Sequence, residues 1–317
     1  MNIIQKCSYE IQNDFLGIDN KYLFYDTTWL DINDDSRIFI DANKHKTFLM
    51  YSGMDWHNEQ CRPTAWKYFE DIETVPIGNY NTENYFSFWL KFTKEHLPIL
   101  ECNGDNISKH FMCLNRKLHP HRIFLLENLY KYDLFRYGLV SVGTPDEYSA
   151  PTILPTPITL DNDIVNSEGD DATTPNVITN DISSYGHMQN WQQHFLNVVT
   201  ETVVHTDVFI SEKTIKPIAG GRPFIILGDD TIYQKLQAWG IDTFDDLFGT
   251  GYNLQWYEQR ADWIREVLSN LIHTPPPDLQ KLYKSLIPRL KNNQERLKEA
   301  QIQNEHMIKK VANRFSC

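Results

Sequence analysis

The sequence has no long apolar run and no paired cysteines. No window approaches the roughly 20 consecutive apolar residues that a membrane span requires, and the N-terminal stretch MNIIQKCSYEIQNDF lacks the apolar core of a signal peptide. We therefore expect no membrane span and a location in the cytoplasm of the producing or host cell. The five cysteines are scattered, odd in number and without a CxxC pair, which predicts free thiols rather than disulfides or a zinc site.

An excess of positive charge is also missing. The net charge is −12 at pH 7, from 30 Lys and Arg against 42 Asp and Glu. Binding to a phosphate backbone without regard to sequence relies on clustered basic residues that displace counterions. The charge therefore argues against a general nucleic-acid-binding protein and leaves room for local basic spots.

The sequence does have the composition of a globular protein with two domains. Of its 317 residues, 41% are hydrophobic and 13% aromatic, so a buried core can form. Apolar runs of strand length alternate with segments of helical periodicity, which is the order that builds a parallel α/β sheet. We expect an N-terminal α/β domain over 1–108, a second α/β domain over 109–274 and a helical tail over 275–317.

The N-terminal domain offers one candidate for acid–base chemistry. An apolar strand predicted at 47–53 ends in a polar loop that carries Asp55, His57 and Glu59. Open α/β sheets present functional side chains at such strand ends. These three residues are candidates for a general base, and the alternative is a solvated loop without chemistry.

A basic turn follows the first strand of the second domain. A strand predicted at 109–115 runs into this turn, and a helix with apolar residues at helical spacing follows. The turn concentrates five basic side chains, Arg116, Lys117, His119, His121 and Arg122. Cations at this edge of a parallel sheet would complement a diphosphate. The next strand is expected at 139–143, before a long irregular connection over 144–184.

A second turn carries an acid beside a base. In the stretch FISEK, which ends at Lys213, a predicted strand gives way to a helix that Ser211 can cap. Lys213 adds a mobile charge for phosphate oxygens, and Glu212 accepts two hydrogen bonds, which suits a ribose diol. Pro217 allows such a helix if regular hydrogen bonding begins near Lys213, and Arg222 is expected to face elsewhere. The alternative is an ordinary surface Glu–Lys pair at a helix entry.

The tail from Pro275 onward is compatible with one long helix. Its apolar residues recur at heptad spacing from Tyr283 to Val311. Because two asparagines and an alanine weaken this seam, we expect a helix that packs on the body of the protein. A self-associating coiled coil is the alternative, so the chain is expected to be a monomer or a weak homodimer.

Together these segments resemble a known family. They look similar to the donor-binding half of α-1,3-fucosyltransferases and of related glycosyltransferase-like proteins of bacteria and their phages. The similar features are a strand with Asn115, a basic turn with Arg122, Glu201 in FLNVVTET, Ser211–Lys213 and Gly221–Ile225. The resemblance implies a GT-B fold, with two Rossmann-like domains, a cleft between them and a nucleotide sugar bound by the second domain. It also implies inverting transfer to an acceptor hydroxyl without a required metal.

The resemblance also assigns roles to individual residues. Lys213 and Arg122 would contact the diphosphate. Glu212 would bind the ribose, and Glu201 would lie near the donor sugar. The full donor-binding set is Asn115, Arg116, Arg122, Glu201, Ser211, Glu212 and Lys213. Fixed cations stabilise the negative charge that grows on a departing diphosphate, so Lys213 is a catalytic candidate as well, and the base would come from the polar loop of the N-terminal domain.

Three other functions fit parts of the sequence. A metal-dependent glycosyltransferase would use an Asp-x-Asp pair after an apolar strand, and Asp161 and Asp163 form such a pair. A phage-type DNA-modifying enzyme would transfer the sugar to a hydroxylated base, although the acidity of the chain argues against it. A non-catalytic module would bind the sugar nucleotide without transferring the sugar.

Overall fold

The computed structural model describes most of the chain after residue 90 and three strands before it. The described residues are 22–26, 47–51, 74–76, 90, 93–143, 151–155, 158, 184–204 and 210–314, with side chains from 90 to 306. The chain divides into two compact units, Phe92–Ala300 and Met1–Lys91 with Gln301–Cys317. The domain boundary predicted after residue 108 lies directly before the strand that begins at Lys109. The unit that contains this strand begins earlier, at Phe92.

The unit that contains the N-terminus has a parallel sheet. β1 (Tyr22–Asp26), β2 (Thr47–Tyr51) and β3 (Thr74–Pro76) lie in this order, with parallel neighbours. β2 pairs with both other strands and is therefore central. It confirms the strand predicted from residue 47, which ends at Tyr51.

The unit Phe92–Ala300 is built on a four-stranded parallel sheet. Its strand order is β5 (Gly138–Val140), β4 (Lys109–Cys113), β6 (His194–Thr200) and β7 (Phe224–Leu227). Every residue of β6 and β7 is buried, as expected of parallel strands that are covered on both faces. The α/β class predicted from the sequence is confirmed for this unit.

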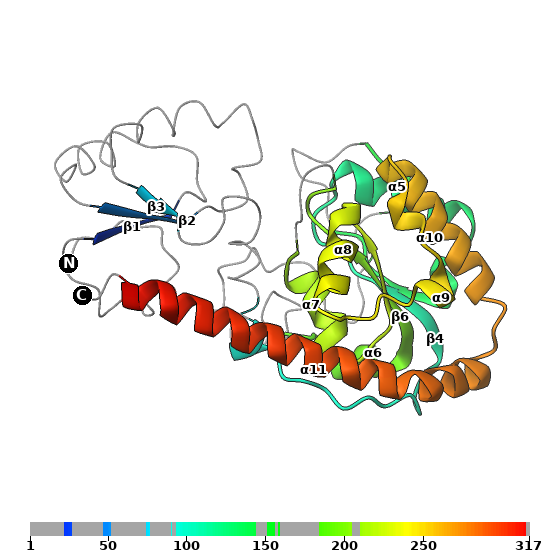
Figure 1. Cartoon of the computed structure of the whole chain (residues 1–317). Helices are drawn as coiled ribbons and strands as arrows, with labels where there is room; N and C mark the ends of the chain where they lie inside the picture. The colour runs from blue at the N-terminus through cyan, green and yellow to red at the C-terminus, as the bar shows by residue number, and fades with distance from the viewer. Residues whose placement is uncertain are drawn as a thin grey trace. The chain divides into compact units, whose positions relative to one another are not determined.

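Two crossovers in opposite directions determine which face each helix covers. From β4 the chain passes through α5 (Pro120–Lys131) to β5, and from β6 it passes through α7 (Glu212–Ala219) to β7 on the other side. Right-handed crossovers in opposite directions put their helices on opposite faces of the sheet. Figure 1 shows α5 beside α10 (Tyr257–Leu271), with α7 away from this pair.

Local signals explain where these helices begin. Pro120 is the first residue of α5, where an α-helix has no use for a backbone N–H. Ser211 caps α7 by accepting a hydrogen bond from Lys213 N, and Asp229 caps α8 (Asp230–Ala238) in the same way. The shorter elements are α6 (Met188–Gln193), α9 (Asp245–Phe248) and the 3₁₀ turns η2 (Phe135–Tyr137) and η3 (Gly251–Asn253).

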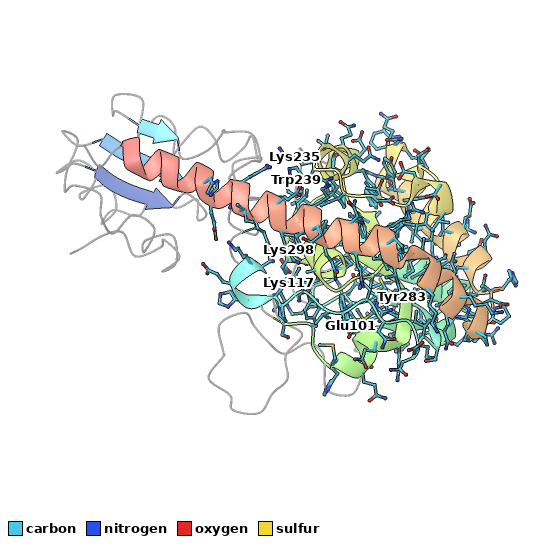
Figure 2. All side chains as sticks on the ribbon, turned by 60° about the horizontal axis from the view of Figure 1, so that its bottom comes forward. Glu101, Lys117, Lys235, Trp239, Tyr283 and Lys298 are labelled. Atoms are coloured by element: carbon cyan, nitrogen blue, oxygen red, sulfur yellow. The ribbon has the colours of Figure 1, made fainter. Side chains whose placement is uncertain are left out.

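One long helix, α11 (Pro276–Arg314), forms the tail. Its heptad positions are buried in the unit that contains the four-stranded sheet: Tyr283, Leu286, Leu290, Asn293, Leu297 and Ala300. Tyr283, labelled in Figure 2, donates its hydroxyl to Gly221 O. Asn293 accepts the backbone N–H of Asp242 and donates to the Asp242 carbonyl, so a polar seam position is satisfied by the body of the unit. Among the described helices, none is both long and apolar enough to cross a membrane.

The connection between β6 and α7 differs from the sequence prediction. Ile210, where a strand is predicted to end, is buried but belongs to no strand, and β7 pairs directly with β6. Residues 205–209 lie outside the described residues. The chain returns to the edge where β6 ends because Glu201 and Ser211 are hydrogen-bonded to each other.

Pro217 lies inside α7 and is tolerated because the helix is short. Regular hydrogen bonding begins when Ile215 N donates to Ser211 O. Proline has no N–H to offer to Lys213 O, the acceptor four residues earlier. The helix ends two residues later at Ala219, so a single helical bond is lost rather than a long ladder.

Candidate functional site

The carboxyl ends of β4 and β6 lie where the sheet reverses its winding direction. β4 leads to β5 on one side and β6 leads to β7 on the other, so these two neighbours form the switch point of the sheet. Open parallel sheets bind ligands outside such a point, because the loops that leave the two strands diverge there. Two residues of the predicted donor site lie here: Asn115 is two residues beyond β4, and Glu201 directly follows β6.

Asn115 ties together the ends of three strands. Its backbone N–H donates to Ser141 Oγ at 3.0 Å, and its Oδ1 accepts the Thr200 hydroxyl at 2.6 Å. Gly143 N donates to Asn115 O at 2.8 Å, and the missing side chain of Gly143 leaves room for the carbonyl of Arg116. Asn115 is only 1% exposed, so it stabilises the arrangement of the strand ends around the site.

Glu201 holds the first turn of α7. The residue is completely buried, and its carboxylate accepts hydrogen bonds from Ser211 N at 3.1 Å, Ser211 Oγ at 2.7 Å and Thr214 Oγ1 at 2.6 Å. A carboxylate at a helix N-terminus is also stabilised by the helix dipole. Glu201, which follows β6, therefore caps the N-terminus of α7. Its position near a donor sugar stays a prediction.

Glu212 and Lys213 form an ion pair at the same helix start. Lys213 Nζ lies 3.0 Å from Glu212 Oε1 and 3.2 Å from Ser211 Oγ. The side chain of Glu212 is 7% exposed, whereas that of Lys213 is 33% exposed. Burial acts to raise the pKa of Glu212, but the charges of Lys213 and Lys216, together with side-chain hydrogen bonding by Lys213 and Ser211, outweigh it, and the net shift of this pKa is downward. Glu212 is therefore a carboxylate at neutral pH.

The second carboxylate oxygen of Glu212 is buried and finds no hydrogen-bond donor among the described residues. A buried charged oxygen without a donor costs free energy, so such atoms are normally paired with protein, water or ligand. Beside it lies the partly exposed ammonium of Lys213. The helix start thus offers a hydrogen-bond acceptor and a cation next to each other at the edge of the sheet.

Arg122, in the basic turn, points inward to the end of β6. It is 4% exposed, and its Nη2 donates to Thr200 O at 3.1 Å and to Thr202 Oγ1 at 3.3 Å. Burial lowers the pKa of Arg122 to about 10, while the negative charges of Glu201 and Glu212 oppose this shift. Arg122 therefore lies near both carboxylates, and a contact with a diphosphate stays a prediction.

His121 also turns inward from the basic turn. Its Nε2 lies 2.8 Å from Glu201 O, and its ring meets the ring of Tyr257 at 6.2 Å, edge to face. Arg116 is half-buried, and Lys117, labelled in Figure 2, is exposed. His119 is half-buried as well, so Arg116, Lys117 and His119 reach the surface, whereas His121 and Arg122 are buried.

Arg260, from the first turn of α10, is a residue of this edge that the sequence did not reveal. It is 3% exposed, and it donates to Gly228 O and, at 2.9 Å, to Val204 O. These carbonyls lie just beyond β7 and β6. With Arg122 bound to Thr200 O, two arginines from different helices hold the segment that leaves β6. No local pattern marks Arg260, because a single arginine on a helix is usually exposed.

Arg222 lies away from this site, as expected from the sequence. It precedes β7, at the amino edge of the sheet, and donates to Asn103 O and Gln192 O. Its guanidinium stacks over the ring of Tyr283 at 4.8 Å.

The structure brings six of the predicted donor-site residues to one edge of the sheet: Asn115, Arg122, Glu201, Ser211, Glu212 and Lys213. Other predicted residues, Asp55, His57, Glu59, Asp161 and Asp163, lie outside the described residues. Within the described ranges, no group of three or more His, Cys, Asp or Glu side chains is arranged to hold a metal ion.

Comparison with protein-family models, with curated proteins and with solved structures gave no match for this chain. The resemblance to the fucosyltransferases therefore rests on the residues named above.

Proposed function

We propose that this chain is an inverting glycosyltransferase that binds a nucleotide sugar at the carboxyl edge of β4 and β6. It would transfer the sugar to an acceptor hydroxyl. Its fold would be of the GT-B type, with the donor bound by the unit Phe92–Ala300. The reaction would need no metal, because cations of the chain would stabilise the leaving diphosphate.

The observation that carries this proposal is the start of α7. Glu212 offers a buried carboxylate oxygen that finds no donor among the described residues, and Lys213 offers a partly exposed ammonium beside it. A ribose diol can donate to the carboxylate, and a diphosphate can accept from the ammonium and lie at the positive end of the helix dipole. A nucleotide carries both groups at adjacent positions, so it fits better than a free sugar or a free phosphate.

The same geometry suggests different roles for the cations of the site during transfer. Cleavage of the glycosidic bond leaves the electron pair on the diphosphate oxygen while the acceptor oxygen attacks the opposite face of the anomeric carbon. The ammonium of Lys213 is partly exposed on a long side chain and would turn toward the growing negative charge, whereas Arg122 and Arg260 are bound to main-chain carbonyls. The acceptor proton would pass to a base in the polar loop that follows β2.

A thermal-shift screen with UDP-, GDP-, dTDP- and CMP-sugars tests the proposal. A ligand at 100 times its dissociation constant stabilises the folded state by about 2.7 kcal/mol, which is a readily measured rise in melting temperature. We expect a rise with one nucleotide class and none with the free sugars. Glu212→Gln should lose the response, and Asp278→Asn, at an exposed carboxylate of α11, should keep it. No response to any nucleotide would refute the proposal.

A transfer assay separates the remaining alternatives. Nucleotide release is measured with glycans, small hydroxyl compounds and DNA with hydroxylated bases as acceptors, with and without EDTA. Release with glycans or small hydroxyl compounds that survives EDTA is the expected result. Loss restored by manganese would favour Asp161 and Asp163, transfer to DNA alone would favour the DNA-modifying enzyme, and binding without release would favour the non-catalytic module.

A further inference from the structure

Trp256 leaves a large aromatic surface exposed at the start of α10. The residue is 56% exposed, has an extended backbone at the N-cap position, and donates its backbone N–H to Gln259 Oε1 at 3.3 Å. Tryptophan is highly buried on average, because its indole has a large apolar surface. An indole left open beside a ligand site is therefore a candidate contact for a planar ligand group.

The contacts of α10 put its first turn at the carboxyl edge of the sheet. Tyr257, the residue after Trp256, meets the ring of His121, which contacts Glu201 O. Arg260 donates to Val204 O beyond the end of β6. Arg260 therefore reaches the segment that leaves β6 directly, and Tyr257 is linked to it through His121.

The backbone places Trp256 one helical turn before Arg260, because Arg260 N donates to Trp256 O at 3.1 Å. Arg260 reaches the carbonyls beyond β6 and β7. The N-terminal end of α10, where Trp256 lies, is therefore at this edge of the sheet.

The carboxylate that would bind a ribose belongs to the same group of side chains. The negative charge of Glu212 acts on Arg122, and Arg122 follows His121 in the chain. His121 in turn meets the ring of Tyr257. These contacts connect Glu212, through Arg122 and His121, to the first turn of α10, which follows the exposed indole of Trp256.

We propose that Trp256 is the stacking platform for the nucleobase of the bound nucleotide, an inference that rests on the proposed function. The indole face contributes affinity to every base, because stacking requires no base-specific hydrogen bond. Trp256 thereby favours nucleotides over sugar phosphates and over pyrophosphate.

Calorimetric titration with UDP, GDP, dTDP and inorganic pyrophosphate tests the assignment. Trp256→Ala should weaken binding of the nucleoside diphosphate that the wild type prefers by about 5- to 150-fold, the range that base–aromatic stacking supplies. Pyrophosphate, which has no base, should bind both proteins equally. Trp256→Phe should retain most of the affinity, whereas Trp256→Leu, which keeps apolar bulk without an aromatic face, should lose it.

Tyr132→Ala is the matched control. Tyr132 is an aromatic residue of nearly equal exposure, 57%, but it follows the C-terminal end of α5 and therefore lies at the opposite edge of the sheet. This variant should bind nucleotides as the wild type does, and circular dichroism checks that each variant is folded.

Several results would overturn the assignment. Unchanged nucleotide affinity in Trp256→Ala would overturn it and leave the proposed function standing. Equal weakening of nucleotide and pyrophosphate, or a Phe variant as weak as the Ala variant, would show that the indole does not act through stacking. A wild type that binds no nucleotide would overturn this inference together with the proposed function.

Discussion

Replacing Glu201 by alanine removes the group that holds the start of α7. Three buried donors then lose their acceptor: Ser211 N, Ser211 Oγ and Thr214 Oγ1. Arg122 also loses one of the two negative charges that act on it. The change therefore disturbs both turns of the site while it leaves the sheet intact.

The expected cost follows from these contacts. A buried donor without an acceptor costs about 1–3 kcal/mol, but a hydroxyl can rotate to another acceptor, so the three terms do not add in full. Glu201 is also one of two carboxylates whose charge acts on the buried guanidinium of Arg122, and we expect Glu201→Ala to cost about 3–5 kcal/mol in total. Glu201→Gln keeps the shape and one acceptor oxygen and should cost about 1–2 kcal/mol.

Urea unfolding of the three proteins, followed by circular dichroism, measures the global effect. Since the chain has two compact units, unfolding need not be a single transition, and hydrogen exchange provides a local probe. The amide of Ser211 donates to Glu201, so it should lose protection in Glu201→Ala. Thr214→Val, which removes one donor, is a control with a cost of about 1 kcal/mol.

Two outcomes would refute this reasoning. One is a Glu201→Ala protein that unfolds at the same urea concentration as the wild type. The other is an unchanged exchange rate at the amide of Ser211 in that protein. Either would mean that the carboxylate does not hold α7 in solution.

Three further predictions concern catalysis, pH and packing. Lys213→Ala should lower turnover by raising the activation free energy by roughly 2–4 kcal/mol, and it should change donor affinity less, because the ammonium acts on charge that develops in the transition state. Steady-state kinetics measure the turnover and calorimetry measures the donor affinity. Full activity of this variant would contradict the proposed role. Burial raises the pKa of Cys113 from 9.0 to about 12, so only the unfolded thiol ionises as the pH rises above 9 and the folded state loses stability, by up to about 1.4 kcal/mol per pH unit. Between pH 8 and 10 the urea midpoint should therefore fall more in the wild type than in Cys113→Ala, and equal falls would contradict this. Gly143→Ala should cost at least about 1–3 kcal/mol, because its methyl group would collide with the carbonyl of Arg116, and a melting temperature equal to that of the wild type would show that the backbone can move apart.

The starts of α5 and α7 could be predicted because their signals are local. Pro120 suits the first position of α5, and Ser211 is a typical cap for α7. The strands β2 and β6 are apolar runs that need no distant partner to be recognised. Fold class and the position of both turns therefore follow from short stretches of the sequence.

The residues that frame the site could not be predicted in the same way, because their partners are distant in the chain. Arg260 binds a carbonyl 56 residues away, and Arg122 binds one 78 residues away. A cluster of cations in a turn has the same sequence whether it faces phosphate or strand-end carbonyls. Whether such a cation binds a ligand or a strand-end carbonyl depends on whether its side chain is buried, and that depends on how α5 and α10 pack on the sheet.

Glu201 and Ser211 join the two ends of the connection between β6 and α7 directly, through side-chain hydrogen bonds. The position of the helix start therefore does not depend on the length of chain between Val204 and Ile210. Each doubling of a loop raises its closure cost by only about 0.6 kcal/mol. Insertions and substitutions can therefore accumulate in this stretch among descendants of this chain while Glu212 and Lys213 keep their places at the edge of the sheet.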